Sequence, residues 1–198
     1  YRELRDVDHY QDDPLVQRVL GLKQLPDAAT ISRMLKAADR QTVDKLRRLL
    51  TDMVLERIGS FAVSRITLDF DGSVQSTKRR AEGSAVGFNK KKKGSRSYYP
   101  LFCTVAQTGQ VFDFLHRAGN VHDSNGARKF ILQCVQVVRG QLPGVVIEVR
   151  MDSAFFSDEI VAALAEKGIQ YTFSVPFERF VELKQMIEGR QRWSVINE

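Results

Sequence analysis

The sequence predicts an α/β fold in which helices cover a mixed β-sheet, preceded by a small helical region. Residues 65–74 alternate apolar and polar side chains with the period of a strand. Residues 98–116 contain two further strand-like runs joined by a short turn with a glycine, which indicates a hairpin. Beyond residue 124, helical and strand patterns alternate, as expected where crossover helices join parallel strands.

The composition fits a folded protein with a sizeable core. The chain has 198 residues, of which 43% are hydrophobic and 27% charged. It contains no run of eighteen apolar residues and no signal-peptide pattern. Cys103 and Cys134 stand outside any CxxC or histidine-rich context, so we expect buried thiols. The chain begins without methionine, and we expect it to be a piece of a longer protein.

The first sixty residues read as helical. Pro14 follows Asp13 at the start of a short apolar run, which is typical of a helix N-terminus. Two further segments carry apolar residues at helical spacing, at 28–38 and from Asp39 or Gln41 to Ile58. We therefore divide the chain into a helical region, 1–60, and a core that contains the sheet, 61–198.

The order of elements in the core narrows the fold. The strand at 65–74 is followed by the hairpin, by a helix capped by Asp123 or Ser124, and by four further strand and helix patterns. The later segments are a strand at 144–152, a helix from 158 to 168, a strand at 169–175 and a helix around 180–186. This β-β-β-α-β-α-β-α order predicts a five-stranded mixed sheet with the topology of the ribonuclease H-like fold.

Acidic residues end two of the predicted strands. Asp69 and Asp71 share one face of the first strand, and Asp71 lies at its tip. Asp152 ends the strand at 144–152. In the ribonuclease H-like topology these strands are parallel neighbours, so Asp71 and Asp152 should converge and hold two Mg²⁺ or Mn²⁺ ions. Asp69 is either another metal ligand or the partner of a basic side chain.

Most of the positive charge lies in one segment. The whole chain has a formal net charge of +6, yet residues 74–97 contain eight basic side chains and a single acid, Glu82. Such a local excess indicates a polyanion partner such as DNA, although a solvated loop is the alternative. The candidate DNA-binding residues are Lys78, Arg79, Arg80, Lys90, Lys91, Lys92, Lys93 and Arg96.

Several motifs together resemble the DDE transposases of bacterial insertion sequences. They occupy residues 68–73, 82–83, 87–89, 98–101, 119–124 and 152–157, and the resemblance spans about residues 10–198. It implies that residues 61–198 are a ribonuclease H-like core that cuts and rejoins DNA with Mg²⁺, with Asp71 and Asp152 as the first two catalytic acids. It implies DNA contacts for residues 1–60. It also implies that the protein binds transposon-end DNA and target DNA and associates with further copies of itself on that DNA. The resemblance further implies a cytoplasmic location in association with the bacterial nucleoid.

The resemblance leaves the third catalytic acid without a match. The family uses a glutamate on a late helix, but Glu178, Glu182 and Glu188 lack the surrounding tyrosine and arginine spacing. We expect the third acid beyond Glu198 and weak or absent activity in this chain alone.

Two other functions fit parts of the sequence. Asp69 and Asp71 also resemble the first motif of haloacid-dehalogenase-type phosphatases, in which the first aspartate is a nucleophile. That fold continues its first strand with α/β alternation, which the hairpin pattern opposes. The other alternative is a DNA-binding remnant that uses residues 90–93 without cutting DNA.

Overall fold

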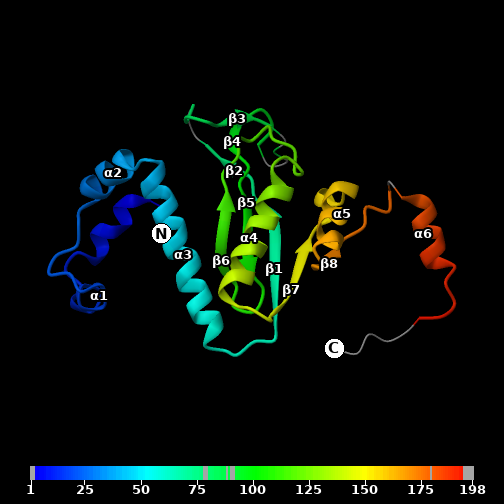
Figure 1. Ribbon diagram of the computed structural model, residues 1–198. Coiled ribbons are helices and arrows are strands. Elements are labelled where there is room, and N and C mark those ends of the chain that lie inside the picture. The colour runs from blue at the N-terminus through cyan, green and yellow to red at the C-terminus, as the bar shows by residue number, and fades with distance from the viewer. Residues whose placement is uncertain (1–2, 78–79, 88, 90–91, 179, 194–198) are drawn as a thin grey trace. The chain divides into compact units, whose positions relative to one another are not determined.

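The structure is a computed structural model that describes residues 3–77, 80–87, 89, 92–178 and 180–193. The chain divides into two compact units, residues 1–49 and 50–198. Their helices and strands are labelled in Figure 1. Among the described residues, no helix has both the length and the apolar character needed to cross a membrane.

The first unit is helical, as the sequence predicts. It contains a 3₁₀ helix, η1 (Leu4–Tyr10), then α1 (Pro14–Leu20), α2 (Ala28–Ala37) and the first half of α3 (Arg40–Gly59). Asp13 caps α1 by accepting hydrogen bonds from two backbone amides, and Gly21 ends it in the left-handed conformation.

The boundary between the units lies inside α3, not after residue 60 as the sequence division has it. The reason is the burial of the second half of α3: Val54, Leu55 and Ile58 belong to the hydrophobic core of the second unit. A helix that contributes three side chains to a core is held by that core over its final turns.

The second unit is built on a five-stranded mixed sheet in the order β6-β5-β1-β7-β8. β1 pairs with β5 antiparallel and with β7 parallel, while β8 continues the parallel side. The strands are β1 (Arg65–Gly72), β5 (Leu101–Val105), β6 (Gln110–Leu115), β7 (Val146–Met151) and β8 (Gln170–Phe173). This is the predicted ribonuclease H-like topology, so the fold prediction is confirmed.

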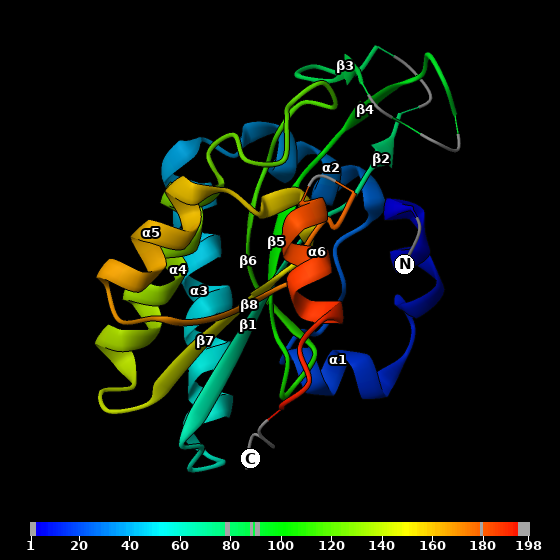
Figure 2. The same ribbon diagram turned by 90° about the vertical axis from the view of Figure 1, so that its right-hand side faces the viewer.

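Helices α4 (Ala127–Gln141) and α5 (Asp158–Glu166) lie on the same side of this sheet (Figure 2). The 3₁₀ helix η2 (Ser153–Phe155) joins β7 to α5, and α6 (Val181–Glu188) is the last helix described. Gly126 precedes α4 with a φ of 73°, and no side chain caps this helix. The predicted cap by Asp123 or Ser124 is therefore wrong.

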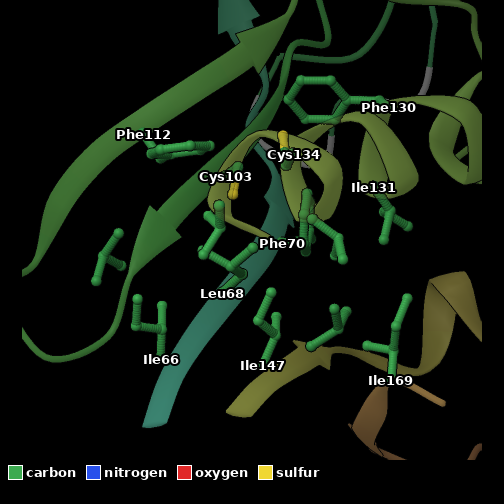
Figure 3. Packing of buried hydrophobic residues seen from close by; sticks show 14 of the residues in the cluster. Ile66, Leu68, Phe70, Cys103, Phe112, Phe130, Ile131, Cys134, Ile147 and Ile169 are labelled. Carbon is green, nitrogen blue, oxygen red and sulfur yellow. The ribbon is translucent and has the colours of Figure 1, made fainter. Parts of the chain in front are cut away.

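The core lies between the sheet and α4. Figure 3 shows Ile66, Leu68 and Phe70 of β1 pointing into it, and each is at most 2% exposed. Phe70 meets Phe130 of α4 edge to face, with ring centroids 5.8 Å apart. Cys103 and Cys134 are buried free thiols in the same cluster, as predicted. The alternation along β1 thus buries one face and leaves Asp69 and Asp71 on the other.

A second, small sheet lies within the basic segment, where the sequence predicts none. Its three strands are β2 (Gln75–Ser76), β4 (Arg96–Tyr98) and β3 (Ala85–Val86), in the order β2-β4-β3. Strands of two or three residues are too short to show a period in the sequence. Figure 2 shows this sheet beyond the ends of β1 and β5, on the side where β1 ends.

Candidate active site

Two carboxylates meet at the ends of neighbouring parallel strands. Phe70 of β1 is in register with Met151 of β7, so the next residues along the two strands are Asp71 and Asp152. The side chain of Asp152 also accepts a 3.0 Å hydrogen bond from the amide of Ala154, which fixes one of its oxygens at the start of η2. The structure therefore brings together two acids that lie 81 positions apart in the sequence.

The electrostatics of this pair favour a bound cation. Partial burial, and then the neighbouring charges of Asp152 and Asp123, raise the pKa of Asp71, although its hydrogen bond from Gly72 opposes the shift. Among the described residues, neither Asp71 nor Asp152 forms an ion pair. Two carboxylates that repel each other and lack a cationic partner are oxygen donors suited to a hard divalent ion.

The described residues do not complete a metal site by themselves. Within these residues, no group of three or more His, Cys, Asp or Glu side chains is arranged to hold a metal ion. Glu188, on α6, instead lies 3.7 Å from Lys184 in an exposed ion pair. The third acid expected beyond Glu198 stays a prediction, because residues 194–198 lie outside the described part of the chain.

The Asp69 carboxylate forms an ion pair with Arg150. Its two carboxylate oxygens accept hydrogen bonds of 2.6 and 2.7 Å from Arg150, its register partner on β7. This bidentate ion pair favours the structural role over a metal-binding one. It also opposes the phosphatase alternative, in which Asp69 would be a free nucleophile. The hairpin that follows β1 opposes that fold as well.

The basic segment is only partly described. Arg80, Lys92 and Lys93 are exposed, whereas Lys78, Arg79, Lys90 and Lys91 lie outside the described residues. Arg96 is half-buried and donates hydrogen bonds to the side chain and the carbonyl of Ser84, so it stabilises the small sheet. Among the described candidates, three basic side chains thus remain exposed for a polyanion.

A cavity of about 820 Å³ extends from the end of β1 to Lys92 of the basic segment. It is lined by Gly72 and Ser73 at the end of β1, by Lys92, by Tyr99 and by the loop that includes His122 and Asp123. The lining mixes apolar and polar groups, and it includes Lys92 but neither Asp71 nor Asp152.

Sequence reasoning misses Tyr99, Arg117 and Asp123 as members of this site. It interprets Asp123 as a helix cap, although Asp123 lies near enough to raise the pKa of Asp71. Arg117 is 6% exposed and carries no signal in the sequence. The indications in the sequence are the motifs at 98–101 and 119–124, which contain Tyr99 and Asp123. The three side chains meet only through tertiary structure.

The comparison with known families agrees with this geometry. A family model described as transposase DDE domain group 1 matches residues 1–192. The chain belongs to this family. The DDE transposase assignment extends over the helical unit and the ribonuclease H-like core together. No curated protein matches the sequence significantly.

Solved structures of transposases and integrases are similar to this DDE transposase chain only at low identity. A piggyBac transposase synaptic complex with hairpin DNA is 13% identical, with a TM-score of 0.45, over 96% of this chain and 42% of that one. The Mos1 transposase paired-end complex with left transposon end is 10% identical, with a TM-score of 0.41, over 97% and 65%. The HTLV-2 integrase catalytic core domain in complex with magnesium is 13% identical, with a TM-score of 0.38, over 67% and 78%.

Proposed function

We propose that this chain is the catalytic core of an insertion-sequence transposase that cleaves DNA strands and transfers them to a target. The observation that carries the proposal is the convergence of Asp71 and Asp152 at the ends of β1 and β7. Membership of the DDE transposase family supports the same function. The chain spans less than half of the piggyBac chain to which it is similar, so strand transfer by the whole protein is part of the proposal.

In this proposal Asp71 and Asp152 hold Mg²⁺ or Mn²⁺, with two ions in the active complex. When bound, the ions would neutralise the negative charge that develops on the attacking and leaving oxygens during cleavage of a phosphodiester. The chain's own residues bind and orient the strand. Lys92 and Lys93 attract its phosphates, and the cavity beside Gly72 receives the backbone next to the acidic pair.

The proposal is tested by strand cleavage in the protein that contains this chain at its natural length. Cleavage of a DNA with matched transposon ends should require Mg²⁺ or Mn²⁺ and should stop when EDTA removes the ion. The 198-residue chain alone should cleave weakly or not at all. Robust cleavage by this chain alone would contradict the prediction that the third acid lies outside it, and cleavage that persists in EDTA would refute the metal mechanism.

The lysines should contribute through charge rather than through base recognition. Replacing both Lys92 and Lys93 by Ala should weaken DNA binding to a similar degree for different sequences. The slope of log affinity against log salt should become shallower by about 1 for each phosphate that the variant no longer binds. Lys129→Ala on α4 is the control, because Lys129 is exposed but does not line the cavity. Fluorescence anisotropy across a salt series measures both quantities, and an unchanged slope would argue against phosphate binding by these lysines.

A DNA-binding remnant is the second candidate, favoured by the incomplete set of carboxylates among the described residues. It predicts salt-dependent DNA binding that needs no metal. It also predicts no cleavage even in a longer protein. The cleavage assay with and without metal separates the two functions.

A further inference from the structure

His122 lies in the wall of the cavity beside the end of β1. It belongs to the loop of residues 119–125, and residues 119–123 of this loop all line the cavity. The side chain of His122 is exposed, so a ligand that enters the cavity can reach it. What the ring can bind depends on which of its two nitrogens carries the proton.

The hydrogen bonds of the His122 ring fix the position of that proton. Nδ1 lies 3.0 Å from the hydroxyl of Ser124 and 3.4 Å from the amide nitrogen of the same residue, which donates to it. A backbone amide can only donate, so Nδ1 accepts and the neutral ring carries its proton on Nε2. No described residue accepts a hydrogen bond from Nε2–H, which is therefore available to a ligand.

Arg117 is a buried side chain that holds the loop backbone around His122. It is 6% exposed. Its Nη1 donates hydrogen bonds of 2.8 Å to the carbonyl of Asp123, 3.1 Å to that of Asn125 and 3.4 Å to that of His122. Its Nε donates one of 3.0 Å to the carbonyl of Tyr99. One guanidinium thus ties the loop to the segment that precedes β5.

The first residue of the loop packs closely against the small sheet. The Gly119 amide donates a 2.9 Å hydrogen bond to the carbonyl of Ser97 on β4. A Cβ atom at Gly119 would come within 2.8 Å of the Ala85 carbonyl oxygen, and one at Gly87 would overlap the Gly119 carbonyl. Only glycines let the two backbones approach this closely. The loop is held at both ends, which limits the entropy lost when His122 binds a ligand.

Lys92 lines the same cavity from the basic segment. Its amide donates a 3.0 Å hydrogen bond to Oδ1 of Asn89, a side chain that is 6% exposed. Among the described residues of the lining, Lys92 carries the positive charge and Asp123 the negative one. An anion there must overcome repulsion by Asp123, so it needs a cation and a further hydrogen-bond donor. Lys92 and His122 Nε2–H supply these two groups.

We propose that His122 binds a backbone phosphate of the DNA through Nε2–H, with Lys92 as the second partner of that phosphate, and so holds the strand beside the end of β1. The inference rests on the proposed function, because it takes DNA as the ligand. His122 donates as a neutral group, whereas Lys92 neutralises a charge. Contacts of this kind fix the position of a strand and do not read its base sequence.

Binding of a short mixed-sequence DNA duplex to the 198-residue chain, in EDTA and at about pH 8, tests the role of His122. At this pH free imidazole is neutral. His122→Ala and His122→Phe should each weaken binding by about tenfold, because a hydrogen bond to a charged group is lost. The slope of log affinity against log salt should stay unchanged in both variants, since a neutral donor releases no counterion. In Lys92→Ala the slope should become shallower by about 1.

His122→Gln and His116→Phe are the controls. The glutamine amide can still donate to a phosphate, so His122→Gln should keep more affinity than His122→Ala. His116 is exposed and stacks on Tyr98 with ring centroids 4.6 Å apart, but it does not line the cavity. A phenyl ring can still stack there, so His116→Phe should bind DNA like wild type. Wild-type affinity in His122→Phe, an equal loss in His116→Phe, a shallower slope in His122→Ala, or a His122→Gln variant as weak as His122→Ala would overturn the inference.

Nitrogen NMR of the labelled histidine rings gives a direct measure of the contact. The His122 ring should show the Nε2–H tautomer without DNA, and its Nε2 signal should shift when the duplex is added. The Nδ1–H tautomer, an Nε2 signal that does not move, or a wild-type chain that binds no duplex would overturn the inference. Because EDTA removes the metal, these results are independent of strand cleavage, and the cleavage assay on the natural-length protein decides the catalytic proposal separately.

Discussion

Asp71→Asn is expected to abolish metal-dependent strand cleavage while DNA binding stays intact. The change keeps the shape of the side chain but removes one of the two charges that, in the proposed function, hold the cation and so stabilise the developing negative charge. Loss of one electrostatic stabiliser of a transition state costs about 10²–10³-fold in rate, and the loss of a metal ligand should be at least as large. Asp152→Asn should have the same effect, measured in the natural-length protein with anisotropy as the binding readout.

Asp69→Asn is the matched comparison for this prediction. Asp69 lies on the same strand and the same face as Asp71, but it forms a bidentate ion pair with Arg150. Its replacement should reduce cleavage far less than that of Asp71. Equal losses in the two variants would mean that Asp69 is itself a metal ligand, contrary to the geometry.

Phe130→Ala is expected to have the largest effect on stability. Phe130 is 2% exposed and packs edge to face on Phe70, directly beneath the strand that carries Asp71. Truncation of a buried phenylalanine costs about 3–5 kcal/mol, because apolar burial is lost and a cavity is left behind. This is a large part of the stability of a typical domain. Urea unfolding followed by circular dichroism measures the decrease in the free energy of unfolding.

Phe177→Ala is the control, because Phe177 is 37% exposed. Its free energy of unfolding should change by less than about 1 kcal/mol. Should Phe130→Ala fail to fold, Phe130→Leu retains most of the apolar volume and should show a smaller loss of the same sign. Equal losses at positions 130 and 177 would contradict the assignment of the core to the β1–α4 interface.

The sheet is predictable because its strands carry their own signals. β1 alternates strictly, β5 and β6 are separated by a short turn with Gly109, and β7 is a mostly apolar run that ends in an acid. Once the order of these strands is known, the topology rules place β1 beside β7. The acidic pair then follows from the fold, since it requires only that two strands end at the same edge.

The features that escape prediction depend on interactions between distant segments. The small sheet has strands too short to show a period. The unit boundary inside α3 depends on which half of a uniform helical pattern is buried by the core. The Arg117, Tyr99 and Asp123 cluster uses backbone carbonyls and a close approach to Gly72, which leave no spacing rule in the sequence.

The central claim, that Asp71 and Asp152 hold divalent cations between them, is tested most directly by paramagnetic broadening of amide NMR signals with Mn²⁺. At substoichiometric Mn²⁺, the signals of Gly72 and Ser153 should broaden first, because these residues follow the two acids. The broadening should reverse with EDTA and disappear in Asp71→Asn and Asp152→Asn. Broadening centred elsewhere, for example around Asp158 and Glu159, or unchanged broadening in both variants, would contradict the claim.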